Sequence, residues 1–384
     1  MNLVLGALTA DAASLGLHWI YDFKHLQKVA GTSPEFKTPD SKNYEGVFSF
    51  YAHGMKQAGD FSHYGETLLV YLKSQLNALA EIHPGTPNLR SYQTLYRDTF
   101  GPGGSFYGYI DNPTRLTLNN LNQQEAEAIE EAKKISKALP DEIAKVVVQK
   151  VLPYTRKYSG EDLKVPIARA IQVTYSQPEI LETALVIAKA IDQKKKLRSG
   201  ADDQQCPAWS TLSALCTFSS HMEEKKFLAN LEEVVRVTNN SDAAVVHVQF
   251  AASFLRSLQK EKSLEKAFLQ ASSQAPLELQ NHVKKVWNKK YSSLEVASGE
   301  IGRTCYLREA LPLCLYILQN TSNFKEALRM NILAGGDSCG RAMFLGAAAV
   351  ALYGVDDTHG LDATWLLRIR RGTEIAELVS TGGL

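Results

Sequence analysis

The chain has 384 residues, of which 45% are hydrophobic and 22% charged, a composition typical of a folded globular protein with ample material for a core. Its 42 basic and 41 acidic residues leave a formal net charge of +1, which gives no electrostatic basis for binding nucleic acid or an anionic membrane. No apolar run reaches the roughly 18 residues of a membrane span. Five cysteines without a Cys-x-x-Cys pair predict free thiols, and we expect a soluble, cytoplasmic protein.

The N-terminal segment is apolar but is interrupted by an acidic residue. Residues 1–10 lack a basic region and Asp11 follows them, so we expect the start of a buried helix rather than a signal peptide. A buried carboxylate needs a partner. Asp11 therefore predicts either a structural hydrogen bond or a place in a site, and the nearby His18, Trp19 and Tyr21 could form an aromatic wall.

Two long irregular stretches, 31–65 and 100–115, interrupt the chain early and contain many aromatic residues. Long loops inside a helical domain are usually functional or disordered, and this aromatic content disfavours disorder. The second stretch carries Gly103, Gly104 and Gly108, which would let the backbone approach a ligand closely. We therefore expect these stretches to wall a ligand site, with a packed surface loop as the alternative.

A cluster of polar side chains lies within 59–72, around the start of an apolar helix. Its members are Asp60, Ser62, His63, Tyr64 and Glu66. Ser62 or Asp60 could cap the helix, and Glu66 is favourable near its positive end. A His or Tyr beside a carboxylate could perform acid–base chemistry or orient a sugar hydroxyl.

Most of the remaining chain shows apolar residues at three- and four-residue spacing, which predicts helices. Strand-type alternation is nearly absent, and the best strand-like stretch, 43–51, is short. We therefore predict an all-α fold, a single compact multi-helix bundle with long irregular loops. The predicted helices are 66–82, 122–138, 141–151, 179–193, 223–237, 242–259, 262–272, 276–290, 307–319, 324–333 and 340–353.

Near the C-terminus, a Gly-Gly-Asp-Ser corner precedes a helix rich in alanine and glycine. Gly335 and Gly336 allow a sharp turn and a close approach to a ligand. Asp337 and Ser338 are good N-cap residues, so the following helix could present free N–H groups to an anion. This corner predicts a site for a metal, sugar or phosphate, and an ordinary capped helix corner is the alternative.

Three segments of the chain resemble motifs of the ADP-ribosylglycohydrolases, whose relatives include the jellyfish J1-crystallins. Residues 6–12 resemble the opening Gly-x-x-x-Gly-Asp-Ala, with Ala10 in place of the second glycine. Residues 62–66 fall where the family has Thr-Asp-Asp-Thr-Gln, and residues 335–339 fall on Gly-Gly-Asp-Thr-Asp. The order and spacing fit over the whole chain, and together the three motifs are moderately specific.

The resemblance implies one all-α domain over 1–384 that cleaves a glycosidic bond of ADP-ribose. Such a protein binds an ADP-ribose-like molecule or an ADP-ribosylated protein. Asp337 or Asp11 would then act as base or electrostatic stabiliser, together with His63. The substrate would be held by the residues of the three motifs and the glycine loop, namely Ser62, Tyr64, Glu66, Gly103, Gly104, Gly108, Gly335, Gly336, Ser338 and Arg341.

The resemblance also implies a pair of Mg²⁺ ions held by acidic residues of the second and third motifs. Carried over position by position, the ligand set is Ser62, His63, Tyr64, Asp337, Cys339 and Gly340. Only Asp337 is a carboxylate, and Mg²⁺ requires oxygen ligands. A dinuclear magnesium centre is therefore not expected. Zn²⁺ held by His63, Asp337 and Cys339 is a minor alternative, and the charge of Arg341 could replace the ions.

Two classes of function follow. The first is a divergent, metal-independent hydrolase or binding protein for an ADP-ribosyl ligand, because the replaced positions remain polar. The second is a catalytically inactive binding or structural protein of the crystallin kind. A third possibility is a nucleophilic Cys339 with His63 as its base, which rests on two residues only.

Overall fold

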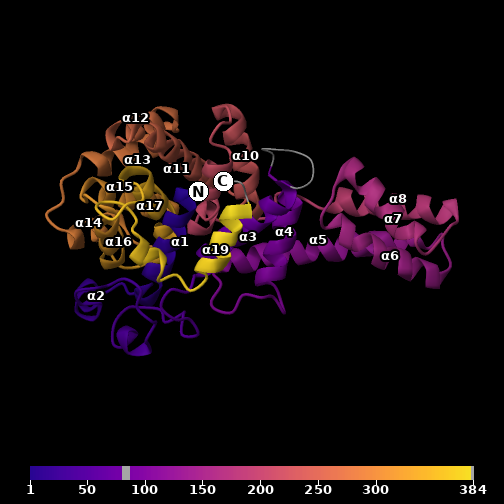
Figure 1. Ribbon diagram of the computed structural model, residues 1–384, viewed down its shortest axis with the longest axis horizontal. Helices are drawn as coiled ribbons and strands as arrows, with labels where there is room; N and C mark the ends of the chain where they lie inside the picture. The colour runs from indigo at the N-terminus through magenta and orange to yellow at the C-terminus, as the bar shows by residue number, and fades with distance from the viewer. Residues whose placement is uncertain (80–86, 382–384) are drawn as a thin grey trace.

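The computed structural model describes residues 1–79 and 87–381, and in these ranges the chain is built from helices joined by loops (Figure 1). The helices are α1 Asn2–Ser14, α2 Phe23–Ala30, α3 His63–Leu79, α4 Leu89–Phe100, α5 Asn112–Ser136, α6 Asp141–Thr155, α7 Lys164–Gln172, α8 Pro178–Lys194, α9 Leu212–Phe218, α10 Glu224–Thr238, α11 Asp242–Glu261, α12 Leu264–Gln274, α13 Leu277–Asn288, α14 Leu294–Ile301, α15 Leu307–Gln319, α16 Phe324–Leu333, α17 Ser338–Tyr353, α18 Ala363–Leu366 and α19 Gly372–Thr381.

The fold is all-α, as predicted, and each predicted helix corresponds to an observed one. The helix predicted at 66–82 is α3, and its residues 80–82 lie outside the described residues. The strand-like stretch 43–51 forms no strand; Ser49 makes one isolated bridge to Ile20. The irregular stretch 100–115 ends earlier than predicted, because α5 begins at Asn112 under an Asp111 cap.

Helices α1 and α17 cross at the centre of the main body, and nearly every residue of both is buried. A helix that is apolar on all sides belongs in a core. The two backbones touch at Gly6 and Gly346, where an added Cβ would come within 2.4 Å of the opposite carbonyl oxygen. This close crossing fixes α1 and α17 relative to each other; α1 carries the first of the three motifs, and the third lies at the start of α17.

Helices α6, α7 and α8 pack with the second half of α5 into an arm that extends from the main body (Figure 1). The arm has its own apolar cluster, which includes Ala128, Val147, Ile167 and Ile187 and shares no residue with the main core. The periodicity predicts the arm helices α5, α6 and α8, but it does not show that they form a separate cluster.

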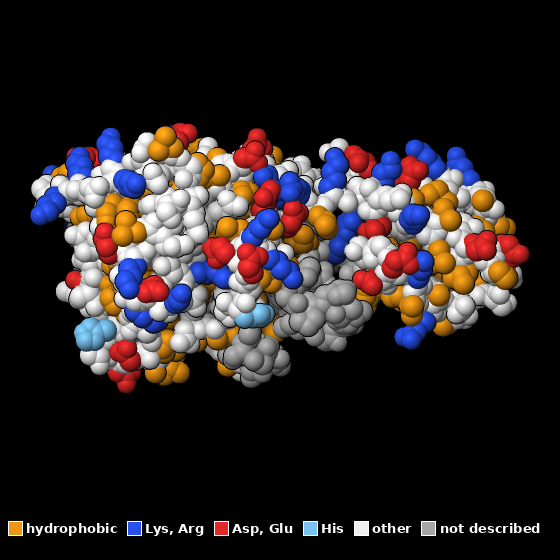
Figure 2. Space-filling view, turned by 90° about the horizontal axis from the view of Figure 1, so that it is seen from above, with side chains coloured by type: hydrophobic (Ala, Val, Ile, Leu, Met, Phe, Trp, Pro, Cys, Tyr) orange, Lys and Arg blue, Asp and Glu red, His pale blue; other side chains and the backbone are white. Residues whose placement is uncertain are grey.

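Charged side chains of both signs are interspersed over the face shown in Figure 2, consistent with the net charge of +1. None of the helices in the described part of the chain combines the length and the apolar character needed to cross a bilayer. All five cysteines are free, and four of them are buried.

Candidate functional site

The three motifs meet where α1, the start of α3 and the start of α17 come together. Ser62 joins α3 to α1, because its backbone N–H and its hydroxyl donate hydrogen bonds of 2.9 and 2.5 Å to the carboxylate of Asp11. Tyr64 joins α3 to α17, because its hydroxyl donates a 2.7 Å hydrogen bond to Oδ2 of Asp337. Residues more than 270 positions apart in sequence therefore share one polar cluster.

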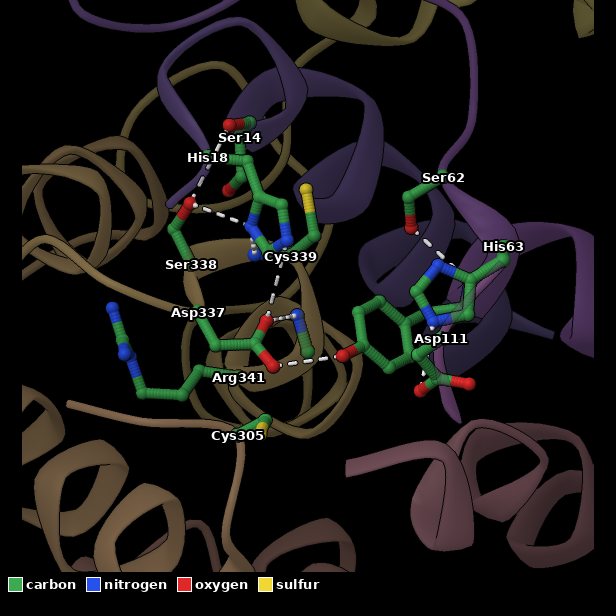
Figure 3. A network of polar contacts seen from close by, with 12 residues as sticks. Ser14, His18, Ser62, His63, Asp111, Cys305, Asp337, Ser338, Cys339 and Arg341 are labelled. Atoms are coloured by element: carbon green, nitrogen blue, oxygen red, sulfur yellow. Dashed lines mark hydrogen bonds and ion pairs between the residues drawn. The ribbon is translucent and has the colours of Figure 1, made fainter. Parts of the chain in front are cut away.

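Asp337 is fully buried and acts as the N-cap of α17. Its Oδ1 accepts a 2.7 Å hydrogen bond from the backbone N–H of Gly340, and its Oδ2 accepts the Tyr64 hydroxyl. Burial raises the pKa of Asp337, while these two hydrogen bonds oppose the rise. Both carboxylate oxygens are therefore already engaged by the protein itself (Figure 3).

Asp11 is also fully buried, and burial raises its pKa to about 6 despite the hydrogen bonds from Ser62. There is no room beside this carboxylate on α3, because a Cβ on Gly65 would come within 2.4 Å of Oδ2. Asp11 therefore serves as the anchor between α1 and α3.

Three buried histidines, His18, His53 and His63, surround this cluster. His18 accepts a 3.1 Å hydrogen bond from the N–H of Cys339 through Nδ1, so its proton is on Nε2, 3.7 Å from Oδ1 of Asp337. Burial lowers the pKa of His18 well below its usual value and that of His53 to about 3. Among the described residues, Nε2 of His18 and both ring nitrogens of His53 and His63 have no hydrogen-bond partner.

Aromatic rings enclose the histidines. Trp19 stacks on His53 with ring centres 6.0 Å apart, and Tyr109 meets the edge of Trp19 at 5.0 Å. Trp19 has a φ of 65°, a left-handed conformation that is unfavourable for a bulky side chain. It is held there by a hydrogen bond from its N–H to the carbonyl of Gly336 and another from Phe50 to its own carbonyl. Of the three residues expected to form an aromatic wall, His18 and Trp19 contact each other, whereas Tyr21 packs against Phe48 and Phe50 instead.

The carboxylate of Asp111 lies 3.1 Å from Nε2 of His63, and only 4% of Asp111 is exposed. The two atoms are within ion-pair distance, which requires a protonated imidazole, but they lack hydrogen-bond geometry, since neither has a hydrogen-bond partner among the described residues. Burial favours the neutral acid, but the charge of His63 and the hydrogen bonds from Thr114 lower the pKa of Asp111 overall. Asp111 is not among the predicted site residues, although an Asp before Asn-Pro is a helix-start signal.

Arg341 is fully buried but points away from Asp337 (Figure 3). Its guanidinium donates to the side chain and carbonyl of Asn331, to the carbonyl of Gly335 and, at 3.3 Å, to that of Arg303. The Asn331 side chain in turn donates to the carbonyl of Ser338. Arg341 therefore fixes the loop before α17, and its donors are used by backbone carbonyls rather than left for a phosphate.

The two glycines of the corner are required by backbone packing. Gly336 has a φ of 64°, and an added Cβ would lie 2.0 Å from the carbonyl oxygen of Arg303. Gly335 has a φ of 78° and approaches the carbonyl of Ile20. Their neighbour Ser338 is buried, and its hydroxyl lies 3.5 Å from both the carbonyl of Ser14 and Nδ1 of His18. These residues shape the loop.

Of the other candidates, Glu66 binds Arg371 near the C-terminus through a 2.5 Å hydrogen bond. The glycine loop delivers Tyr109 and Asp111 to the cluster, while Gly103 has open space around it and Gly104 packs against the last turn of α4. Gly108 packs against Lys56. These glycines therefore shape the loop that carries Tyr109, and Glu66 connects α3 to the C-terminal segment.

Cys339 is fully buried, and burial together with the nearby Asp11 raises the pKa of its thiol well above the usual range. Its Sγ lies 3.7 Å from the carbonyl of Asp11. A reactive cysteine requires a lowered pKa and access to solvent. The surroundings of Cys339 provide neither.

The magnesium pair implied by the resemblance does not fit this donor set. The oxygens of Asp337 are engaged by Tyr64 and Gly340, and the nearby ring nitrogens belong to histidine, a poor ligand for Mg²⁺. Within residues 1–79 and 87–381, no three His, Cys, Asp or Glu side chains are arranged to hold a metal ion. This applies equally to the Zn²⁺ alternative of His63, Asp337 and Cys339.

His53 is a second residue of the cluster that the sequence does not reveal. It lies in the irregular stretch 31–65, where no local pattern marks it as buried. It reaches the cluster because the loop folds back onto the chain that follows α1, as the contact between His53 and His18, 5.2 Å between ring centres, shows.

Comparison with known proteins supports the resemblance over the full length. The ADP-ribosylglycohydrolase family matches residues 1–381. Crystallin J1A of Tripedalia cystophora is 24% identical over 380 residues, covering 97% of this chain and 92% of the crystallin. Crystallin J1B of the same animal is 23% identical over 383 residues, covering 98% and 94%.

The fold also matches a solved structure, that of an ADP-ribosylglycohydrolase-related protein complex. The TM-score is 0.58 at 13% identity, and the match covers 99% of this chain and 95% of the other. The shared all-α fold and the match of the family over residues 1–381 lead to one conclusion. The chain belongs to the ADP-ribosylglycohydrolase family.

Proposed function

We propose that this chain is a non-hydrolytic member of the ADP-ribosylglycohydrolase family with a structural or binding role like that of the crystallins it resembles. The observation that carries the proposal is the Tyr64–Asp337 hydrogen bond, which occupies the one carboxylate that the metal motifs retain. No more than 4% of His18, His63, Asp111 or Asp337 is exposed, so a substrate would have to displace packed side chains to reach them.

The charge distribution supports the same proposal. Burial keeps His18 and His53 neutral at physiological pH, so these two histidines supply no positive charge in place of magnesium ions. The one buried guanidinium at the site, that of Arg341, is used by loop carbonyls. A glycosidic cleavage needs a positioned acid or nucleophile and an accessible sugar. In this cluster, the polar groups are instead hydrogen-bonded to one another or buried away from solvent.

The test combines an activity assay with a binding assay. We expect no release of ADP-ribose from ADP-ribosylated protein above the buffer blank, with Mg²⁺ or with EDTA. A thermal-shift titration with ADP-ribose should show no metal-dependent rise in Tm, since a ligand that binds only the native state raises Tm. Turnover that is lost in Asp337→Ala would overturn the proposal. Metal-independent stabilisation by ADP-ribose would favour a retained ligand site.

A gain-of-function variant sharpens the test. The double substitution His63→Asp with Tyr64→Asp reinstates the acidic pair that the resemblance implies at these positions and frees Oδ2 of Asp337. We expect this variant to bind Mg²⁺ in a calorimetric titration in which the unaltered chain shows no heat of binding. Equal Mg²⁺ binding by both proteins would contradict the proposal. The matched control is His53→Asp, which adds a carboxylate at a position outside the motifs.

A further inference from the structure

A second polar cluster, which contains no residue of the three motifs, lies where α4 and α5 meet the ends of α6 and α8. Four cations converge on a pocket of about 30 Å³: Arg90 and Arg97 of α4, Arg156 just after α6, and Lys195 just after α8. Figure 1 shows α5 running from the main body into the arm, so this pocket lies where the arm begins.

Glu125 of α5 lies at the centre of three of these cations. Its carboxylate accepts hydrogen bonds from Arg97 at 2.9 Å and from Arg156 at 3.0 and 3.2 Å. The Nζ of Lys195 lies 3.5 Å from the same carboxylate. These cations lower the pKa of Glu125 to about 2, against the opposing effect of burial. One carboxylate therefore faces three positive charges, with only 13% of its side chain exposed.

The fourth cation, Arg90, pairs with Asp192 at 3.0 Å through Nη2, which also binds the carbonyls of Asp192 and Lys195. Its Nε and Nη1 are buried and have no acceptor among the described residues. Across residues 1–79 and 87–381, the four cations thus face two carboxylates within the cluster. Asp98 approaches Arg97 to 3.9 Å only, with 56% of its side chain exposed.

The pKa of Lys195 reflects the excess positive charge of this cluster. Burial, together with the charges of Arg90, Arg97 and Arg156, lowers the pKa of Lys195 to about 8 against the attraction of Glu125. Uncompensated charge in a partly buried cluster is costly unless a counter-charge is supplied. A bound anion would supply that charge.

The pocket is preformed. Gln93 donates to the carbonyls of Lys196 and Leu197, and Gln124 accepts the N–H of Lys196. The Thr94 hydroxyl donates to the carbonyl of Arg156 at 2.7 Å. These contacts hold the chain after α6 and α8 against α4 and α5, so the four cations keep their positions. The volume suits one small group, since a cavity needs roughly 10–15 Å³ to hold a water.

We infer that this pocket binds a small inorganic anion, phosphate being the probe of choice, between Arg90, Arg97, Arg156 and Lys195, and that the anion fastens the arm to the main body. Guanidinium groups suit such an anion because they donate in a planar fork. The site is independent of the three motifs and does not depend on the proposed function.

The experiment measures phosphate binding to the full chain by calorimetry and by thermal shift, with sodium gluconate at equal ionic strength as the reference. We expect saturable stabilisation, about 3 °C at a phosphate concentration 100 times Kd for a chain of this size. Amide hydrogen exchange in α6 and α8 should slow at the same time. Chloride is a second probe, which shows whether a monatomic anion suffices.

Arg156→Gln and Lys195→Gln should each reduce phosphate affinity at least tenfold. The matched control is Arg256→Gln, because Arg256 is similarly buried and pairs with Glu224 at 3.0 Å outside this cluster. If a variant fails to fold, calorimetry on the unaltered chain still decides the matter. No saturable binding there, or equal affinity in the cluster variants and the control, would overturn the inference and leave these cations a purely structural role.

Discussion

The hydroxyl of Tyr64 donates a 2.7 Å hydrogen bond to Oδ2 of Asp337, joining the start of α3 to the N-cap of α17. Because both groups are buried, this single bond holds two motif segments together and satisfies a carboxylate that no solvent reaches. The resemblance assigns a metal-binding aspartate to position 64. In this chain, position 64 is instead a tyrosine whose hydroxyl binds Asp337 directly.

Tyr64→Phe should lower the free energy of unfolding by about 2 kcal/mol, because it leaves a buried acceptor unpaired. The loss should be larger at neutral than at acid pH. The pKa of Asp337, already raised by burial, would rise further without the hydrogen bond, and the protonated acid tolerates burial better. Urea unfolding at pH 7.5 and pH 5 measures both effects. Tyr96→Phe is the control, since its hydroxyl bonds the neutral Thr114 and its cost should not change with pH.

His53→Phe should become stabilising as the pH falls. The pKa of His53 is about 3 in the folded chain and near 6.5 when unfolded. Between these two values the unfolded state binds more protons than the folded state, so the stability of the unaltered chain decreases as the pH is lowered. Phenylalanine removes that loss while keeping a ring against Trp19. The difference in free energy of unfolding between the variant and the unaltered chain should therefore be about 2 kcal/mol more favourable to the variant at pH 5 than at pH 7.5. The neighbouring titratable groups, His18, His63 and Lys56, are present in both proteins and so do not account for this difference.

Urea unfolding over this pH range provides the measurement for His53→Phe. The exposed His282, substituted in the same way, is the control and should show a smaller pH-dependent gain. A pH-independent difference between His53→Phe and the unaltered chain would show that His53 is not buried as a neutral ring.

Gly346→Ala should destabilise the chain by several kcal/mol. An added methyl group would lie 2.3 Å from the carbonyl oxygen of Gly6, so α1 and α17 would have to move apart in the core. Gly299→Ala, in the middle of α14 with open space around it, should instead stabilise by roughly 0.5–1 kcal/mol because alanine favours the helix. Thermal unfolding of both variants measures the contrast, and similar effects would contradict the close crossing.

Glu66→Gln should loosen the C-terminal segment around α19. Glu66 accepts a hydrogen bond from Arg371, which also binds Glu374, and 32% of the Arg371 side chain is exposed. Solvent screening therefore limits the expected cost to about 1 kcal/mol. Amide hydrogen exchange should speed up in the described turns of α19. The control is Glu130→Gln, which removes an exposed pair with Lys133. Unchanged exchange in α19 would mean that Glu66 does not fasten this segment.

The sequence predicts the all-α fold well, because most helices carry their own apolar periodicity. It also identifies Asp11, Ser62, Tyr64 and Asp337 as members of unusual polar segments. It does not show that Tyr64 bonds Asp337 or that Arg341 turns toward the loop, since both depend on how α3 and α17 meet. These are tertiary relationships, and no local pattern encodes them.

His53 is another residue whose place in the structure cannot be predicted from the local sequence. Its position in a long irregular stretch gives no sign of burial, and only the fold-back of that stretch onto the chain after α1 places it against His18. The separate cluster of the arm is hidden for a similar reason. The helices α5, α6 and α8 look like any other amphipathic helices until their partners are known.

The corner at Gly335 and Gly336 is held by main-chain bonds. The N–H of Trp19 bonds Gly336, that of Gly336 bonds Ile20, and that of Asp337 bonds Arg303. These three contacts use no side chain, and the guanidinium of Arg341 adds a fourth bond, to the carbonyl of Gly335. The corner is therefore held from the main chain and from Arg341, and none of these bonds involves His63 or Tyr64. Replacing the rings at positions 63 and 64 would therefore leave the bonds that shape this corner in place.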